Sequence, residues 1–244
     1  MPKQNKTLRL PPRNDRSQGF TLSEILITLA IMGTVMAITI PTLTQKANKN
    51  TYVAGLKKTY GLLDTATNQI MMNNSNTLIY AFGTANDQIA NTATMVNKYC
   101  NILECNKICL VDAVDNGCFK AQADIKTLNG QNFWDNPNEH AGFVLADGSL
   151  INVIQVATGQ NCSYTDAGRT FICGWVIIDV NGFKGPNTVG RDIFTLYLNK
   201  DGLIPDGQIG TYIDDDTYCD PTSGNARDGI GCTQKVLNEQ AMDY

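Results

Sequence analysis

The chain has 244 residues, of which 19 are basic and 23 acidic, so its net charge is −4 at pH 7. Proteins that bind nucleic acid need clustered lysine and arginine, and this balance gives no such footprint, so no nucleic-acid partner is expected. About 200 residues follow the apolar N-terminal stretch, which is enough for one moderate domain.

A polar, basic leader occupies residues 1–19. It carries one acidic and five basic side chains, namely Asp15, Lys3, Lys6, Arg9, Arg13 and Arg16. Without these six residues the net charge of the chain falls to near −8. Positive residues stay on the cytoplasmic side of a membrane, so the chain beyond an adjacent membrane helix is expected outside the cytoplasm.

An apolar stretch follows the leader, and it predicts a membrane-spanning helix at residues 20–43. The 21 residues from Phe20 to Ile40 contain one charged residue, Glu24. As a helix rising about 1.5 Å per residue they would cover about 31 Å, the thickness of a bilayer's hydrocarbon core. An ionised carboxylate is costly in a membrane, so Glu24 is a functional residue that needs a cationic partner.

The order of leader and apolar run separates this chain from a secreted product. A secretory signal peptide is cut after its apolar region, following small residues. Here a cut between Gly19 and Phe20 would leave the apolar helix on the mature protein. It would also create an α-amine on Phe20, which is the cationic partner that Glu24 needs. The alternative is a plain single-pass anchor that happens to contain one glutamate.

These residues resemble the N-terminal cleavage and methylation signature of type IV pilins and type II secretion pseudopilins. Besides the basic leader and the apolar run, the matches are Gly19, Phe20, Glu24, Gly33 and Pro41. The resemblance implies that a prepilin peptidase cuts between Gly19 and Phe20 and N-methylates Phe20. It also implies a filament in which Glu24 pairs with the amine of a neighbouring Phe20 and thereby acts in assembly.

After Pro41 a helical period returns on a polar background. Apolar positions recur at steps of three and four, which predicts an amphipathic helix at 44–73 that packs on a sheet. The stripe comprises Val53, Leu56, Tyr60, Leu63, Thr67 and Ile70. We expect one continuous helix from about Phe20 to about Asn73, with Gly55 and Gly61 as places where it could bend.

Short strand-like segments begin at residue 141 and predict an antiparallel sheet at 141–205. A hairpin with an Asp147-Gly148 turn comes first, and further strands follow at 170–180, 192–199 and 203–205. Successive strands with tight turns favour a meander, so the predicted fold class is α+β, a long helix packed on an antiparallel sheet. A short helix is expected around 87–98, and a loop region at 206–244. The resemblance implies the same fold, with 44–244 as an exported pilin-like domain.

Eight cysteines in an exported domain predict a disulfide framework. The expected pairs are Cys162–Cys173 across a hairpin loop, Cys219–Cys232 closing the C-terminal loop, Cys100–Cys118 and Cys105–Cys109. A disulfide-closed C-terminal loop again resembles pilins. The alternative for the first four cysteines is a four-thiolate zinc site, although their spacing lacks the paired C-x2-C of common zinc modules.

Residues for catalysis are scarce, so an enzyme is not expected. The chain contains one histidine, His140, which we expect to be an exposed structural residue. Hydrolase, metalloprotease, nucleotide-binding and C-x-x-C motifs are missing from the sequence. Phe133 and Trp134 are expected to anchor their loop on the core and not to form a ligand platform.

The stretch DVNGFKGPN at 179–187, with Asp192 soon after it, is the best candidate binding site. Closely spaced oxygens of Asp179, Asn181 and Asp192 on a glycine-rich loop suit calcium. The loop is not an EF-hand, since Phe183 takes an oxygen position and the closing glutamate is missing. The alternative is that Asn and Gly only build turns between two strands. Some pseudopilins bind calcium in a loop near the end of the sheet, so the resemblance also implies this ion.

The resemblance implies a structural filament subunit. Its expected partners are like subunits, a prepilin peptidase and methyltransferase, and an inner-membrane assembly platform. It is expected in the bacterial inner membrane with its N-terminus in the cytoplasm, and then in a filament. One alternative is a minor, tip-type subunit whose domain binds a surface, DNA or a secreted substrate. Another is an anchored monomer without an assembly role. The residues do not separate type II secretion, type IV pilus and competence systems.

Overall fold

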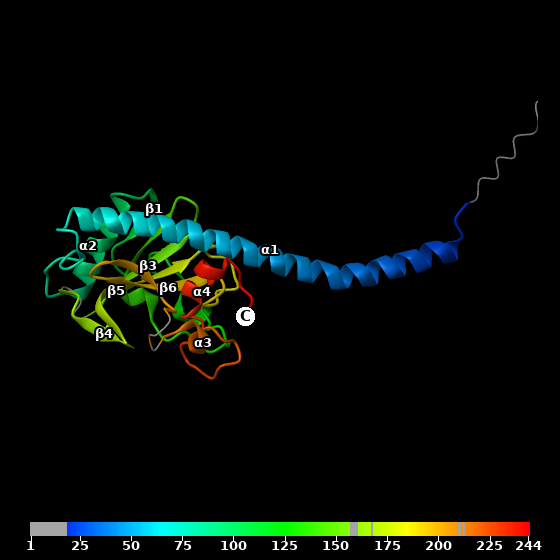
Figure 1. Ribbon diagram of the computed structural model, residues 1–244. Coiled ribbons are helices and arrows are strands. Elements are labelled where there is room, and N and C mark those ends of the chain that lie inside the picture. The colour runs from blue at the N-terminus through cyan, green and yellow to red at the C-terminus, as the bar shows by residue number, and fades with distance from the viewer. Residues whose placement is uncertain (1–18, 157–160, 167, 209–210, 212) are drawn as a thin grey trace, which may run out of the picture. The chain divides into compact units, whose positions relative to one another are not determined.

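The computed structural model describes residues 19–156, 161–166, 168–208, 211 and 213–244. Apart from Gly19, the expected leader lies outside these residues. The chain divides into two compact units, residues 1–45 and 46–244, and we call the second unit the head. Figure 1 labels the helices and strands in chain order.

Helix α1 (Leu22–Met72) is continuous across the boundary between the two units, with Pro41 inside it. The expected single long helix is therefore confirmed. In the head, its buried residues recur at steps of three and four: Val53, Leu56, Thr59, Leu63, Ala66 and Ile70. Gly55 has a packing role, because a Cβ atom there would lie 3.0 Å from the Cβ of Val180. A glycine thus lets the chain after the sheet's longest strand approach the helix closely.

Seven strands form one antiparallel sheet in the part of the head that the structure describes. Their order is β1-β2-β3-β5-β6-β7, and β4 pairs with β5. The strands are β1 (Cys105–Cys109), β2 (Ala141–Leu145), β3 (Leu150–Gln155), β4 (Tyr164–Asp166), β5 (Arg169–Asp179), β6 (Ile193–Asn199) and β7 (Gly202–Pro205). The expected meander and the α+β class are confirmed. The edge strand β1 was not expected from the sequence, since CNKIC shows no alternation of apolar and polar residues.

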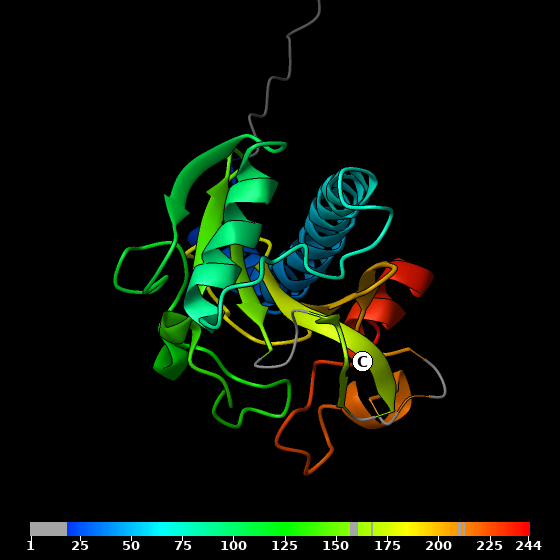
Figure 2. The same cartoon turned by 90° about the vertical axis from the view of Figure 1, so that its left-hand side faces the viewer.

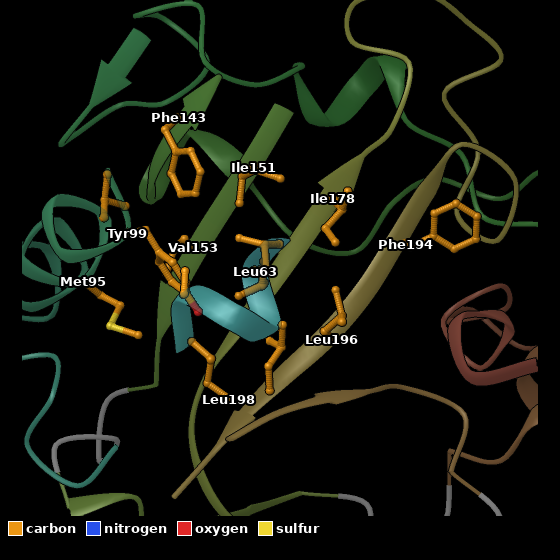
Figure 3. Packing of buried hydrophobic residues seen from close by; sticks show 14 of the residues in the cluster. Leu63, Met95, Tyr99, Phe143, Ile151, Val153, Ile178, Phe194, Leu196 and Leu198 are labelled. Atoms are coloured by element: carbon orange, nitrogen blue, oxygen red, sulfur yellow. The ribbon is translucent and has the colours of Figure 1, made fainter. Parts of the chain in front are cut away.

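Alternate strand residues point to opposite faces of the sheet. The helix face packs on α1 and on α2 (Gln88–Cys100), which confirms the short helix expected around 87–98. Figure 3 shows Leu63 of α1 and Tyr99 of α2 directed at the strand residues Phe143, Ile151, Val153, Ile178 and Leu196. The Tyr99 hydroxyl lies 2.7 Å from the Thr67 hydroxyl, so its polar end is satisfied inside the core.

The opposite, loop face of the sheet carries Asn152, Ile154, Trp175, Ile177, Asp179 and Thr195. Long loop segments cover it, as Figure 2 shows, and Phe119, Ile125, Phe133, Ile213 and Ile230 pack under them. The short helices here are η1 (Gln122–Asp124), η2 (Pro137–Glu139) and α3 (Asp215–Tyr218), followed by α4 (Cys232–Glu239). The region 206–244, expected as loop, therefore contains two helices.

All eight cysteines lie in the described part of the chain and form four disulfides. Cys162–Cys173 and Cys219–Cys232 are the pairs expected from the sequence. The expected pairs Cys100–Cys118 and Cys105–Cys109 were wrong, and so was the zinc alternative. The structure pairs Cys100 with Cys105 and Cys109 with Cys118, over Cα–Cα distances of 5.5 and 6.1 Å.

The missed strand β1 explains this error. Cys105 and Cys109 stand at its two ends. Residues four apart in a strand are separated by about 13 Å, whereas a disulfide needs Cα atoms within about 7 Å. Each cysteine of β1 must therefore turn outward to a partner beyond its own end of the strand.

Trypsin will distinguish the two pairings without reduction. Cleavage after Lys98, Lys107 and Lys120 gives one peptide of residues 99–107 and another of residues 108–120, each with two cysteines. The structure predicts two separate peptides, each lighter by two hydrogens than its reduced form. Mass spectrometry of a non-reduced digest measures this directly. A single species that joins the two peptides would contradict the pairs in the structure.

Candidate functional site

The predicted processing residues lie at the start of α1. Gly19 and Phe20 precede the first helical residue and are exposed, Phe20 to 83%. Thr21 donates from its backbone N–H and from its hydroxyl to Glu24 Oε2, each at 2.8 Å. The Glu24 N–H donates back to the Thr21 hydroxyl at 3.2 Å. This reciprocal pair is a capping box, which satisfies two of the free N–H groups at a helix start.

Glu24 therefore has a partner within its own chain, which the sequence analysis did not foresee. The signal was present as Thr21-Leu22-Ser23-Glu24, the T-x-x-E pattern of a capping box. Both recorded bonds use Oε2, so Oε1 can accept from a group outside the described residues. Capping and pairing with an α-amine are therefore compatible uses of one carboxylate.

The apolar side chains after Glu24 have no cover in their own unit. Large apolar residues from Ile25 to Ile40 are each exposed to 42% or more: Ile25, Leu26, Ile27, Leu29, Ile31, Met32, Val35, Met36, Ile38 and Ile40. By length and composition, α1 is the one described helix that could cross a membrane. Burial of this surface needs a bilayer or other helices.

The loop between β5 and β6 brings together the three residues assigned to calcium. Asp179 accepts from the Asn181 backbone N–H at 3.1 Å. Asp192 accepts from the Asn181 side chain at 3.1 Å and from the backbone N–H groups of Asn187 and Thr188 at 2.8 and 2.7 Å. Both carboxylates are fully buried. The loop thus forms one hydrogen-bonded unit around two buried acids.

Lys120 supplies the positive charge of this unit. Its ammonium lies 2.7 Å from Asp179 Oδ2, donates to the Lys184 carbonyl at 2.8 Å and also donates to the Asn187 side chain. An ammonium has three N–H donors, so these three oxygens satisfy it. Lys120 is 5% exposed, and the buried Phe119 and the Cys109–Cys118 disulfide hold its segment in place.

The residues of this loop do not fit the calcium site expected from the sequence. Calcium takes six to eight oxygen ligands. Here an ammonium stands against Asp179, and Asp192 accepts three N–H groups. Among the described residues, no group of three or more His, Cys, Asp or Glu side chains is placed to hold a metal ion. The positive charge beside these carboxylates is the Lys120 ammonium and not a metal ion.

Burial raises the pKa of Asp179 to about 7, while the Lys120 ammonium opposes this rise. A carboxylate this deeply buried is costly unless a positive charge is paired with it. Lys120 is therefore the residue that lowers the cost of ionising Asp179. The residues around Lys120 in the sequence do not predict that it is buried beside Asp179, because lysine is rarely buried.

The expectation for His140 was wrong, because its ring is buried at 9% exposure. Its Nε2 lies 3.3 Å from Asp135 Oδ2, which gives the ring a carboxylate partner. Of the two aromatic residues expected to anchor this loop, Phe133 is buried in the core of the loop face. Trp134 differs, since it is 37% exposed and lines a cavity.

Residues 14–40 match the family model described as the prokaryotic N-terminal methylation motif. The chain carries the type IV pilin and pseudopilin signature. This pilin signature covers the proposed cut, the capping box and the apolar half of α1, and it leaves the head unmatched. Neither a curated protein nor a solved structure matches the chain. The pilin signature and the apolar helix together indicate a membrane-anchored precursor, of a kind that is generally structural and not enzymatic.

Proposed function

We propose that this chain is a structural subunit of a helical filament that is assembled from a bacterial inner membrane by a type II secretion or type IV pilus system. The observation that carries this proposal is the match of residues 14–40 to the methylation motif, at the start of an uncovered apolar helix. Such a helix is stable in lipid, and packing against equivalent helices replaces the lipid in a filament. Like subunits, a prepilin peptidase and an assembly platform are the partners.

Processing creates the charge that assembly uses. A cut between Gly19 and Phe20 yields an α-amine directly before the capping box, and methylation leaves that amine positive. Glu24 Oε2 is held by Thr21, so its position at the helix start is defined before any neighbour arrives. In a filament, Glu24 of one subunit then pairs with the Phe20 amine of another. Because an unpaired buried charge is costly, this pair sets the axial register of neighbouring helices.

The mature N-terminus is the first test. Mass spectrometry of the chain purified from membranes should find a protein that begins with N-methylated Phe20. A Gly19→Leu variant should keep its leader, while a matched Gly33→Leu variant should lose it, since Gly33 lies inside the helix. A wild-type chain that retains residues 1–19 at steady state would instead favour an anchored monomer with no assembly role.

A minor, tip-type subunit is the second candidate, and the cavity beside Trp134 favours it. A major subunit dominates purified filaments, whereas a tip subunit is rare in them. The abundance of this chain relative to the other filament subunits therefore distinguishes the two candidates.

A further inference from the structure

A cavity of about 280 Å³ opens on the loop face of the sheet. It lies between strands β3 to β6 and the loop segments that cover this face. Its apolar lining consists of Ile154, Ile177, Ile213 and Ile230, and its aromatic lining of Trp134, Tyr164 and Trp175. The chain contains two tryptophans, and both line this cavity. Cavities with apolar and aromatic walls and a few placed polar groups are the usual form of ligand sites.

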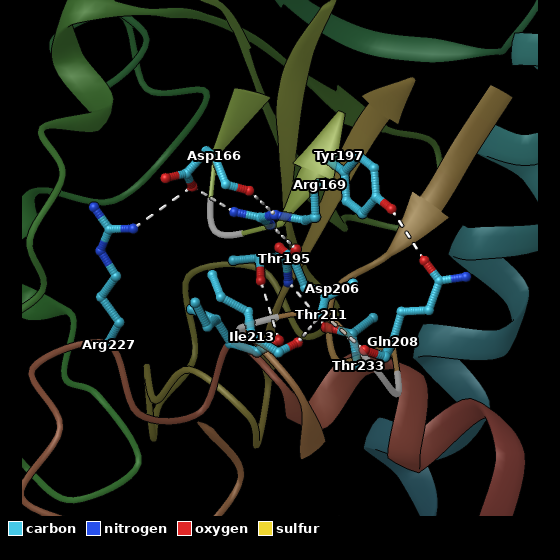
Figure 4. Close-up of polar contacts among 11 residues, drawn as sticks. Asp166, Arg169, Thr195, Tyr197, Asp206, Gln208, Thr211, Ile213, Arg227 and Thr233 are labelled. Atoms are coloured by element: carbon cyan, nitrogen blue, oxygen red, sulfur yellow. Dashed lines mark hydrogen bonds and ion pairs between the residues drawn. The ribbon is translucent and has the colours of Figure 1, made fainter. Parts of the chain in front are cut away.

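Arg169 and its partners make one wall of the cavity rigid. Its guanidinium pairs with Asp206 and, at 2.6 Å, with Asp166, as Figure 4 shows. It also stacks over the Trp175 ring, 5.8 Å from its centroid. Arg169 is 4% and Asp206 2% exposed, so this ion pair is part of the protein interior. Tyr164 meets Trp175 edge to face with centroids 5.7 Å apart, which fixes two of the three aromatic rings.

The rim of the cavity, in contrast, carries polar side chains that are partly exposed to solvent. The side chain of Arg227 is 47% exposed. Its Nη1 atom lies 3.8 Å from Asp166 Oδ2, a long ion pair that Figure 4 shows at one side. Asp135 and Asp166 expose about a quarter of their side chains, 28% and 25%. Trp134 also lines the cavity, and its ring packs against that of Phe133 with centroids 4.5 Å apart.

The mixture of charges selects the kind of ligand. Asp166 pairs with Arg169 and Arg227, Asp206 pairs with Arg169, and Asp135 pairs with His140. The lining therefore mixes negative and positive charges and favours neither an anion nor a cation. An apolar side chain would strip water from these charges without replacing their hydrogen bonds, which is costly. A ring of hydroxyl groups donates to carboxylates and accepts from a guanidinium, and its C–H faces pack on aromatic rings. A neutral polyhydroxylated ring satisfies every class of group that lines the cavity.

We propose that this cavity binds a pyranose ring of a glycan, stacked on Trp134 and Trp175 and hydrogen-bonded at the rim by Asp166 and Arg227. The proposal concerns the head alone and holds whether the chain is a major or a minor filament subunit. It goes beyond the loop-anchoring role expected for Trp134, whose cavity partners come from segments distant in the chain.

Tryptophan fluorescence tests the proposal, because both emitting rings line the cavity. The full chain in detergent is titrated with the methyl glycosides of glucose, galactose, mannose and N-acetylglucosamine. We expect a saturable change in emission with at least one of them. In Trp134→Ala and in Arg227→Met the dissociation constant should rise at least about tenfold, as truncation of a central anchor does. Both positions are exposed, so the fold is expected to survive.

Matched controls separate the cavity from the rest of the surface. Phe183→Ala removes an aromatic residue that is 61% exposed and does not line the cavity, and it should leave the sugar affinity unchanged. N-acetyl-phenylalaninamide and N-acetyl-leucinamide serve as apolar side-chain probes. Saturable binding of these amides without binding of any glycoside would overturn the proposal in favour of a peptide pocket. Sugar binding that survives both cavity variants, or no response to any glycoside, would overturn it as well.

Discussion

Filaments are expected to be absent from cells that carry the Glu24→Ala chain, although its leader is still cut. The substitution leaves the methylated Phe20 amine of each neighbour without a counter-charge inside the packed helices. Loss of one partner from a buried pair costs about 3–5 kcal/mol, which every subunit contact would bear. The measurement is the amount of sheared filament per cell, with the mass of the membrane form as the check on processing.

The capping box supplies the matched controls for this experiment. Glutamine also serves at the third helical position of a capping box, so Glu24→Gln keeps the helix start and removes only the charge. We expect it to form no filaments either. Thr21→Val does the reverse, since it removes the cap hydroxyl and keeps the charge, and filaments should persist. Normal filament levels in Glu24→Gln would show that Glu24 acts by capping, and the charge pair would have to be abandoned.

The second large effect is expected in the head, where Lys120→Met should lower the free energy of unfolding by about 3–5 kcal/mol. The substitution keeps the length of the side chain but leaves the buried Asp179 facing no positive charge. Lys126→Met is the matched control, because Lys126 is an exposed lysine of the same loop segment. Its effect should stay within about 0.5 kcal/mol. Chemical denaturation of the full chain in detergent measures both.

The loss of unfolding free energy in the Lys120→Met chain, relative to the wild type, should grow with pH. Burial already raises the pKa of Asp179 to about 7, and loss of the opposing ammonium raises it further. A carboxyl whose pKa is higher in the folded state favours folding below its unfolded pKa of about 4, and this contribution is lost as pH rises through the folded value. The free energy of unfolding of the variant should therefore be closest to that of the wild type near pH 5. The difference between the two should be largest above pH 7. A deficit independent of pH would contradict the pairing.

Calcium provides an independent check on the same loop. The ammonium stands where a cation would be held, so calcium and chelators should leave the midpoint of wild-type unfolding unchanged. Clear stabilisation of the wild type by calcium would restore the metal site that the sequence suggested.

The elements with regular periods were predictable, because burial of one face repeats along a helix or strand. The stripe from Val53 to Ile70 and the hairpin around Asp147 follow from that alone. The strand β1 was not predictable, since its sequence CNKIC shows no alternation of apolar and polar residues. Its conformation depends on pairing with β2. That one omission also produced the wrong disulfide pairs.

The sites followed a different rule. Residues 14–40 could be read from the sequence because their chemistry is local, apart from the capping box, which the membrane character of the run obscured. Lys120 meets Asp179 across 59 positions, and the cavity collects residues from Trp134 to Ile230. Contacts between residues so far apart in the chain depend on the fold, and the spacing of residues in the sequence does not predict them.

The disulfides follow a simple order along the chain. The first cysteine is bonded to the second, the third to the fourth, the fifth to the sixth and the seventh to the eighth. The sequence separations are 5, 9, 11 and 13 residues. If the N-terminus stays in the cytoplasm, as the basic leader predicts, the head would enter an oxidising compartment from its N-terminal end, one cysteine at a time. Every odd-numbered cysteine then meets its native partner as the first free thiol to arrive. Oxidation in the order of emergence leads directly to the native set, without a step of disulfide exchange.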